Sequence, residues 1–335
     1  MKVSVIVGYY NRREVLKRTL DSLLNQTHSD FEVIVFDDAS TDGTDLELLN
    51  LSNIYNDPRL KYVVHSSNIG FVQGLINAID MATGEYIAIH GSGDVAAPTR
   101  LERQAAYLDQ YRGVGAVGSW YTNVNDLTGD RNPVRPDANH VDLASLRMQN
   151  VYSHGEVMFR RSAYDRAGGY RPEFRFAQDI DLWLRIRREY RLATIPEFLY
   201  ERHILSDGVT HNPKKFSDQA RFSLLARRLL DMTPEETART LSSLRLHGPS
   251  HVVDKADPAL QKRFFWGAID MGLAGSPSNA VISAKENLIS PSKRLLVSGF
   301  FSIYGTKYLG APVRSGANWA LRSRRTLRQA RGRFK

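Results

Sequence analysis

The feature that most constrains this chain is the regular alternation of short apolar runs with helical patterns in its first 90 residues. The apolar runs cover residues 3–7, 31–36, 60–65 and 86–90, and the helical patterns between them cover residues 12–25, 41–54 and 70–81. Buried strands that alternate with helices are typical of a largely parallel sheet covered by helices. Such sheets bind ligands at the carboxyl ends of their strands. We therefore predict an α/β fold with a ligand site at those strand ends.

The pattern changes in the second half of the chain. Residues 113–119 are predicted to form one more strand, and the polar, proline-containing segment 125–139 is predicted to be a surface loop. Helical patterns then follow one another without strands, at residues 214–231, 234–247 and 258–272. Proline lies at or near the start of the last two, as helix N-termini favour. We expect an α/β domain over residues 1–211, a helical extension over 212–290 and a basic, aromatic-containing tail over 291–335.

Basic residues are concentrated in the tail. The net charge is +9, but residues 287–335 hold eleven Lys or Arg and no Asp or Glu, so the rest of the chain is close to neutral. A last basic helix is expected at residues 318–331. Aromatic and aliphatic side chains beside unpaired positive charge favour binding to an anionic membrane surface. The alternative is a solvated tail whose aromatic rings pack on the helical extension. No RNP-type aromatic motif or zinc spacing accompanies the charge, so no nucleic-acid partner is expected.

Other classes of protein are excluded by composition. The chain has no cysteine, which removes disulfides, thiolate metal sites and cysteine nucleophiles and fits a reducing compartment. No apolar segment reaches the roughly 18 residues that a spanning helix needs. The apolar run at residues 3–7 is too short for a secretory signal. We expect a cytoplasmic protein, peripheral on the cytoplasmic face of the membrane.

Acidic side chains follow two of the predicted strands. Asp37 and Asp38 come at the end of residues 31–36, where a carboxylate can accept hydrogen bonds from a base or ribose, or hold a metal ion. Asp42 is expected to be a helix cap. Asp94 ends the run Gly91-Ser92-Gly93-Asp94 after residues 86–90, where glycine lets a diphosphate approach the backbone and the acid could bind a divalent cation. A plain glycine-rich turn explains that run equally well.

A third acidic segment begins an amphipathic helix near residue 178. Asp179 and Asp181 lie in its first turn, where the helix dipole favours carboxylates. The side chains expected to pack inward are Ile180, Trp183, Leu184 and Ile186. Spacing alone leaves two roles open for Asp179, which are simple capping and general base catalysis.

In their order along the chain, these segments resemble glycosyltransferase family 2 over nearly all of residues 1–211. The similarity is carried by residues 4–12, where Gly8 and Tyr9 replace a usual Pro-Thr, and by residues 37–44, 68–70, 84–88, 154–161, 168–170 and 178–185. The resemblance implies a GT-A fold, which is Rossmann-like with a mostly parallel sheet flanked by helices. It also implies a hexosyltransferase-type enzyme that moves a sugar, with inversion, from a nucleotide-diphosphate donor to a hydroxyl of a glycan or lipid-linked acceptor. The pathway implied is synthesis of a glycan, cell-surface polysaccharide or glycoconjugate.

The resemblance also implies roles for individual residues. Asp179 corresponds to the catalytic base, which takes the proton of the acceptor hydroxyl as its oxygen attacks the anomeric carbon. The residues expected to bind the nucleotide sugar are Tyr9, Asn11, Arg12, Asp37, Asp38, Asn68, Asn77 and Asp94.

Two departures from the family pattern concern the donor phosphates. Counted back from Pro98, both acids of the usual Asp-x-Asp pair are glycine, and only Asp94 remains. Ile76 stands before Asn77, where the family often has Arg. The phosphate charge is then met by a cation, Mn²⁺ or Mg²⁺, on Asp94 completed by His203, or by direct contact from Arg202. A lone histidine is more often structural than a ligand.

The missing acids keep a second function open. A catalytically weak or inactive homologue would bind a nucleotide sugar without transferring it, although the retention of Asp94 and Asp179 argues against this. A dinucleotide oxidoreductase is excluded, because no strand is followed by G-x-G-x-x-G.

Overall fold

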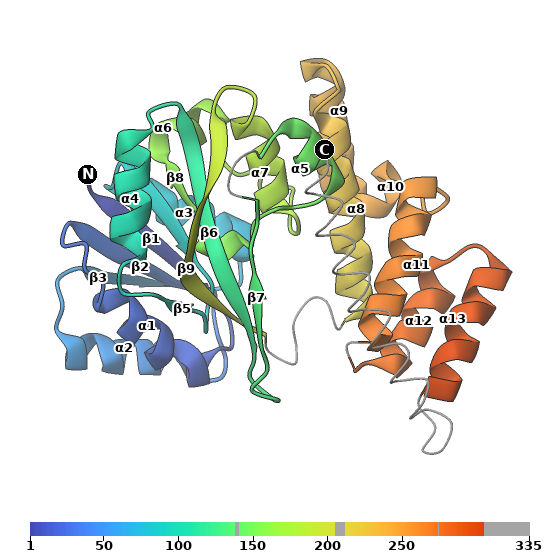
Figure 1. The fold of residues 1–335 in the computed structure, drawn as a ribbon, viewed down its shortest axis with the longest axis horizontal. Helices are drawn as coiled ribbons and strands as arrows, with labels where there is room; N and C mark the ends of the chain where they lie inside the picture. The colour runs from blue at the N-terminus through green and yellow to red at the C-terminus, as the bar shows by residue number, and fades with distance from the viewer. Residues whose placement is uncertain (138–140, 205–211, 274, 305–335) are drawn as a thin grey trace. The chain divides into compact units, whose positions relative to one another are not determined.

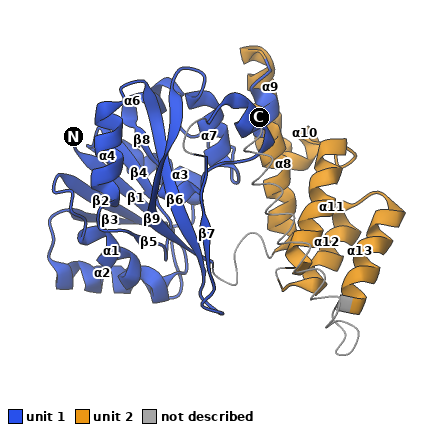
Figure 2. Cartoon of the chain, viewed as in Figure 1, with its two compact units in different colours: residues 1–205, 226–232 blue, residues 206–225, 233–335 orange. Residues whose placement is uncertain are grey.

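The computed structural model describes residues 1–137, 141–204, 212–273 and 275–304 (Figure 1). The chain divides into two compact units (Figure 2). Unit 1 comprises Met1–Leu205 with Ala226–Met232, and unit 2 comprises Ser206–Leu225 with Thr233–Lys335.

A single mixed sheet forms the centre of unit 1. Among the described residues its strand order is β3-β2-β1-β4-β8-β6-β9-β5, and β7 pairs with β6 outside this path. The strands are β1 (Val3–Tyr9), β2 (Phe31–Asp37), β3 (Leu60–Val64), β4 (Tyr86–His90), β5 (Val95–Ala96), β6 (Val114–Asn125), β7 (Arg131–Val134), β8 (Met158–Arg160) and β9 (Arg191–Ile204). The helices of this unit before β9 are η1 (Arg13–Val15), α1 (Leu16–Leu24), α2 (Thr44–Tyr55), α3 (Phe71–Met81), α4 (Arg100–Gln110), α5 (Leu143–Met148), η2 (His154–Glu156), α6 (Arg161–Arg166) and α7 (Gln178–Ile186).

The parallel half of the sheet confirms the prediction from the alternating pattern. β1 pairs in parallel with β2 and β4, and β2 pairs in parallel with β3. Every residue of β1, β2 and β4 is buried, which explains their nearly continuous apolar runs. In register, Tyr9 lies opposite Asp37 and Val7 lies opposite His90. The carboxyl ends of the three strands therefore meet at one edge.

The other half of the sheet corrects one prediction. Segment 125–139 is not entirely a loop, because residues 131–134 form β7, which returns antiparallel to a strand β6 that runs on to Asn125. Asn125 forms the turn by accepting hydrogen bonds from the amides of Leu127 (2.9 Å) and Thr128 (3.2 Å). Pro133 pairs opposite Thr122 in β7, which lies off the main strand path, and proline is tolerated in edge strands.

Helices make up the described part of unit 2, as the sequence predicts. They are α8 (Pro213–Leu229), whose last residues belong to unit 1, α9 (Pro234–His247), α10 (Pro249–Val252), α11 (Pro258–Leu273), α12 (Pro277–Asn287) and α13 (Pro291–Tyr304). None of the described helices combines the length and apolarity needed to cross a bilayer. The expected helix at 318–331 lies outside the described residues.

α13 occupies the first part of the range expected to be a basic tail. It packs on α11 and α12, with Val297 and Phe301 buried. A Cβ on Gly272 of α11 would stand 2.2 Å from the Phe301 ring, so the glycine makes room for that ring. Leu295 and Leu296 stay exposed on the same helix.

Candidate nucleotide-sugar site

The loops after β1 and β2 are joined by hydrogen bonds at the strand-end edge. Asn11 Oδ1 accepts from the amide of Thr41 (2.7 Å), and the amide of Asn11 donates to Ser40 Oγ (2.8 Å). Asp37 is fully buried and accepts from the amide (3.0 Å) and hydroxyl of Ser40. Asn11 has a positive φ of 52°, a conformation that asparagine tolerates better than most residues. The two loops thus form one rigid rim around the Asp37 carboxylate.

Asp38 connects the same rim to α3. Its carboxylate accepts from the amides of Ile69 (2.8 Å) and Gly70 (2.9 Å) and contacts the His65 ring (3.1 Å). Asn68 Nδ2 donates to the Asp38 carbonyl (3.1 Å). Asp38 is buried and holds the loop before α3 against the end of β2, so its role in the rim is to fix the backbone.

The remaining predicted nucleotide contacts are placed differently. Arg12 follows Asn11 and donates its backbone amide to Thr44 Oγ1 (3.1 Å), which holds it at the rim. Asn77 lies on the exposed side of α3, where it accepts from Gln73 (2.9 Å). The structure therefore brings Tyr9, Asn11, Arg12, Asp37, Asp38 and Asn68 to one edge and leaves Asn77 further along the helix.

Asp94 is held inside the protein on both carboxylate oxygens. Tyr200 Oη donates to Oδ2 (2.5 Å), and the amide of His203 donates to Oδ1 (2.7 Å). Burial raises the pKa of Asp94, and these hydrogen bonds act in the opposite direction. The same Tyr200 hydroxyl accepts from the amide of Gly91 (2.9 Å). Asp94 therefore fixes the turn after β4 to strand β9.

A second set of contacts holds the turn from its other side. Arg100 Nη1 donates to His90 Nδ1 (3.0 Å), which leaves His90 Nε2 to donate to the carbonyl of Asp94 (3.1 Å). Burial, and then the charge of Arg100, lower the pKa of His90 to about 3, so the ring is neutral. Thr19 Oγ1 accepts from the amide of Gly93 (2.9 Å). The turn is thus rigid without a bound ligand.

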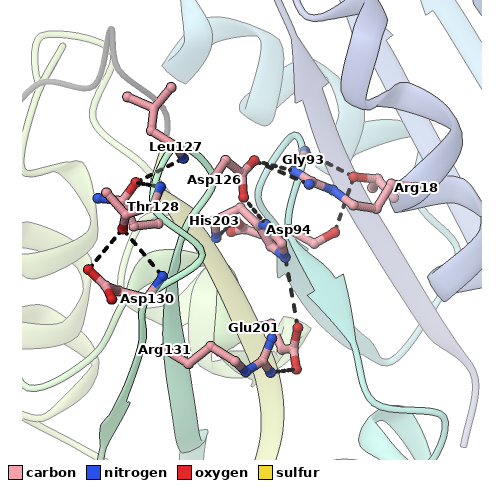
Figure 3. Close-up of polar contacts among 12 residues, drawn as sticks. Arg18, Gly93, Asp94, Asp126, Leu127, Thr128, Asp130, Arg131, Glu201 and His203 are labelled. Atoms are coloured by element: carbon pink, nitrogen blue, oxygen red, sulfur yellow. Dashed lines mark hydrogen bonds and ion pairs between the residues drawn. The ribbon is translucent and has the colours of Figure 1, made fainter.

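A chain of alternating charges lies over this turn (Figure 3). Arg18 of α1 donates to Asp126 Oδ2 through Nη1 (3.2 Å) and Nη2 (3.1 Å), and Asp126 Oδ1 accepts from His203 Nδ1 (2.5 Å). His203 Nε2 lies 3.8 Å from Glu201 Oε2, and Glu201 also pairs with Arg131 of β7. Burial raises the pKa of Asp126, but His203 and Arg18 hold it below its usual value.

Sequence reasoning missed Tyr200, Arg18 and Asp126. Tyr200 precedes the predicted His203 by three positions and has no motif of its own. Arg18 and Asp126 are 108 positions apart, and Asp126 falls in the segment taken for a loop. Arg202, the other predicted phosphate contact, stacks on the Tyr121 ring at 5.7 Å.

A divalent cation fits the residues around Asp94 poorly. Gly91 and Gly93 offer no side-chain ligand, and both oxygens of Asp94 accept hydrogen bonds from the protein. A Cβ on Gly93 would lie 3.2 Å from Arg18 Nη2, so a cationic group already borders this position. Nowhere in the described chain do three or more His, Asp or Glu side chains form a metal-binding group.

The acids at the start of α7 have opposite environments. Asp181 is buried and pairs with Arg171 Nη1 (2.8 Å) and Arg185 Nη2 (2.7 Å), so its role is structural. Asp179 is half-buried, and its Oδ2 accepts from Asn150 Nδ2 (2.5 Å). The inward packing of Ile180, Trp183, Leu184 and Ile186 is confirmed.

A neutral histidine lies close to Asp179. Burial lowers the pKa of His154, against the charge of Asp179. His154 Nε2 is hydrogen-bonded to Tyr170 Oη (2.7 Å), and its Nδ1 lies 3.4 Å from Gln178 Nε2. Asp179 and His154 thus form these hydrogen bonds with uncharged side chains, which are Asn150, Tyr170 and Gln178.

A parallel α/β half with a rigid acidic rim at its strand ends defines a nucleotide-binding class of protein. Comparison with known proteins narrows this class. Residues 4–168 match the sequence model of Glycosyl transferase family 2. The Bacillus subtilis protein EpsE, named as a glycosyltransferase, is 34% identical over 210 residues, which cover 62% of this chain and 74% of EpsE. The chain belongs to glycosyltransferase family 2, and it is a glycosyltransferase.

Further relatives and solved structures agree with this assignment. The O-antigen biosynthesis glycosyltransferase WbnJ of Escherichia coli is 27% identical over 227 residues, covering 66% of this chain and 87% of WbnJ. Staphylococcus aureus TarS 1–349 in complex with UDP matches with a TM-score of 0.55 at 20% identity, covering 92% of this chain and 93% of that one. The Pyrobaculum calidifontis mannosyltransferase PcManGT, in complex with GDP-Man and Mn²⁺, matches with a TM-score of 0.56 at 22% identity. The match covers 94% of this chain and 83% of PcManGT. The predicted GT-A fold is confirmed.

Proposed function

We propose that this glycosyltransferase moves a sugar from a nucleoside-diphosphate donor to an acceptor hydroxyl with inversion at the anomeric carbon. The observation that carries the proposal is the contrast between the two acids of α7. Asp181 is neutralised by two arginines, whereas Asp179 is half-buried and accepts a hydrogen bond from the neutral Asn150 amide. A carboxylate in that state can take up a proton.

The chemistry is a single displacement at the anomeric carbon. Asp179 removes the proton of the acceptor hydroxyl as that oxygen forms its bond to the sugar, and the bond to the nucleoside diphosphate breaks on the opposite face. The Asp37 rim orients the nucleoside, because its carboxylate and backbone amides lie at the strand ends where such sheets bind nucleotides. The relatives' names, which include O-antigen biosynthesis, support a role in cell-surface polysaccharide synthesis.

The first experiment tests the base. Asp179→Asn is expected to slow transfer about 10²- to 10⁴-fold, the usual loss for a general base. Its thermal stabilisation by the donor should stay close to that of the wild type, because the base acts on the acceptor. UDP- and GDP-sugars are screened first by thermal shift, and turnover is then followed as released nucleoside diphosphate.

Asp80→Asn is the matched control, since Asp80 is an exposed acid of α3. Near-normal turnover by Asp179→Asn would remove the assigned base. A wild-type protein that is stabilised by a donor yet transfers nothing to any acceptor would instead favour the inactive homologue, which the two glycines at positions 91 and 93 suggest.

We also propose that unit 2 binds an anionic membrane surface, which would bring the enzyme to a lipid-linked acceptor. Leu295 and Leu296 are 74% and 56% exposed on α13, and Lys293 and Arg294 precede them. Exposed aliphatic side chains beside basic ones suit an anionic bilayer interface. The aromatic residues expected to contribute from position 305 onward lie outside the described residues.

Vesicle sedimentation tests the membrane proposal. The full chain should sediment with phosphatidylserine vesicles more than with neutral ones, and Leu295→Ser with Leu296→Ser should reduce that fraction. Equal, salt-insensitive partitioning onto both kinds of vesicle would refute it.

A further inference from the structure

We infer that Arg18 and His203 form a hydrogen-bonding site for the donor diphosphate, and that Asp126 holds these two side chains in place until the donor replaces it. The inference rests on the proposed donor class. It assigns to side chains the charge compensation that a divalent cation would otherwise supply.

The location of Arg18 is the first argument. The turn at residues 91–94 follows β4 directly, at the edge where β1, β2 and β4 end and where open α/β sheets bind ligands. Arg18 Nη2 lies 3.2 Å from the point where a Cβ on Gly93 would stand. Gly93 has a φ of 94°, which suits glycine, and a Cβ there would also lie 3.1 Å from Val15 Cγ2. The guanidinium therefore borders the position where the sequence pattern would place a metal-binding acid.

The Asp126 carboxylate occupies the site as a phosphate would. Its two oxygens are divided between Arg18 and His203, which come from α1 and β9. Figure 3 shows the carboxylate between the Arg18 guanidinium and the His203 ring. Guanidinium and imidazole groups bind phosphate oxygens with the same charge-assisted geometry that they use for a carboxylate.

Unused hydrogen-bonding capacity is the second argument. Arg18 Nε and His203 Nε2 are both buried and make no hydrogen bond, and the nearest carboxylate to His203 Nε2 is that of Glu201, 3.8 Å away. The His203 side chain is only 10% exposed. Buried polar groups are nearly always paired, and those left unpaired often mark a missing ligand. A diphosphate has more acceptor oxygens than the single carboxylate that now lies there.

The exchange requires little from the protein. Asp126 is the first residue after β6, at the start of the turn to β7, and its side chain is 25% exposed. Rotation of this side chain toward solvent would free the Arg18 guanidinium and the His203 ring, while the hydrogen bonds of Asn125 keep the turn closed.

Calorimetric titration of UDP and GDP tests the inference, in EDTA and then with Mn²⁺. Wild-type protein should bind one of the two in EDTA, with an affinity that Mn²⁺ changes little. Arg18→Gln should weaken that binding about tenfold or more, while Arg18→Lys restores part of it. Asp126→Asn should tighten it, because a competing anion is removed. Uridine or guanosine, which lack phosphate, should bind equally to all four proteins.

Arg166→Gln is the control, since Arg166 forms an ordinary exposed ion pair with Glu189. A nucleotide that binds only with Mn²⁺, and binds more weakly to Asp126→Asn, would overturn the inference and make Asp126 a metal ligand. Equal affinities in wild type and Arg18→Gln would overturn it as well. Failure of the wild type to bind any nucleoside diphosphate would instead reject the proposed donor class. Because Asp126→Asn is expected to gain affinity, misfolding cannot imitate the predicted result.

Discussion

Removing one hydroxyl group from Tyr200 is expected to destabilise unit 1 strongly. The Tyr200 hydroxyl donates to Asp94 Oδ2 (2.5 Å) and accepts from the amide of Gly91 (2.9 Å), so Tyr200→Phe breaks two hydrogen bonds at once. The ring itself can remain where it is, 4.9 Å from the guanidinium of Arg100. The variant therefore measures the hydrogen bonds and little else.

The magnitude follows from burial. Tyr200 is 2% exposed and Asp94 is 7% exposed, so water cannot easily replace the lost partner. A hydrogen bond to a charged group contributes roughly 1.5–3 kcal/mol, and the bond from the part-buried Gly91 amide contributes roughly 0.5–1.5 kcal/mol. Protonation of Asp94, whose pKa burial already raises, relieves part of this cost. We expect a loss of about 3 kcal/mol, equivalent to a melting temperature lower by roughly 6–12 °C for a unit of this size.

Urea and thermal unfolding of the full chain give the measurement. Tyr121→Phe is the matched control, because Tyr121 lies opposite Tyr200 in register and its ring carries the Arg202 contact. The control is expected to lose less stability than Tyr200→Phe, because phenylalanine keeps the ring that contacts Arg202. Equal stability of the two variants would refute the view that Asp94 is a structural anchor.

Two further predictions concern stability. The pKa of histidine is about 6.5 in the unfolded chain, and that of His90 in the folded protein is about 3. Between these values the unfolded state binds more protons, so the free energy of unfolding falls as the pH drops below about 6.5. From pH 7 to 5 this contributes a loss of about 2 kcal/mol, which urea unfolding should find in wild type and not in His90→Gln. Gly272→Ala places a Cβ 2.2 Å from the Phe301 ring, which should lower the free energy of unfolding by roughly 1–3 kcal/mol and lower the melting temperature. An unchanged melting temperature would contradict the packing of α13 on α11.

The fold of unit 1 could be predicted because its signal is local. The parallel strands are short apolar runs with a helix between each and the next, so the alternation is visible in the sequence. Asp37 and Asp179 could be proposed as site residues for a related reason, since Asp37 ends a strand and Asp179 lies in the first turn of a helix. Placing the site at the strand ends needed only the rule that such sheets bind ligands there. The pairing of Tyr9 with Asp37 comes from the structure.

Strand β7 was missed for an equally physical reason. Residues 131–134 are Arg-Asn-Pro-Val, and the first three are exposed. The third, Pro133, has no backbone amide proton. Such a strand forms only because β6 extends far enough to pair with it, and β6 extends because β9 pairs along its whole length. Propensity cannot predict an edge strand that depends on a neighbour so distant in sequence.

The charge network over the turn after β4 illustrates the same limit at the site. The sequence shows that Gly91 and Gly93 stand where the family often has acids. This tells us that metal ligands are missing, but not which groups replace them. The compensation that we infer comes from Arg18 on α1 and His203 on β9, which Asp126, beyond β6, holds in place. No spacing rule connects these three residues. Asp126 holds the Arg18 guanidinium and the His203 ring on the same carboxylate in the free protein. A carboxylate in this position keeps both groups oriented before the donor arrives. Its replacement by a diphosphate then exchanges one anion for another with more charge, so binding gains electrostatic energy without the cost of assembling the site.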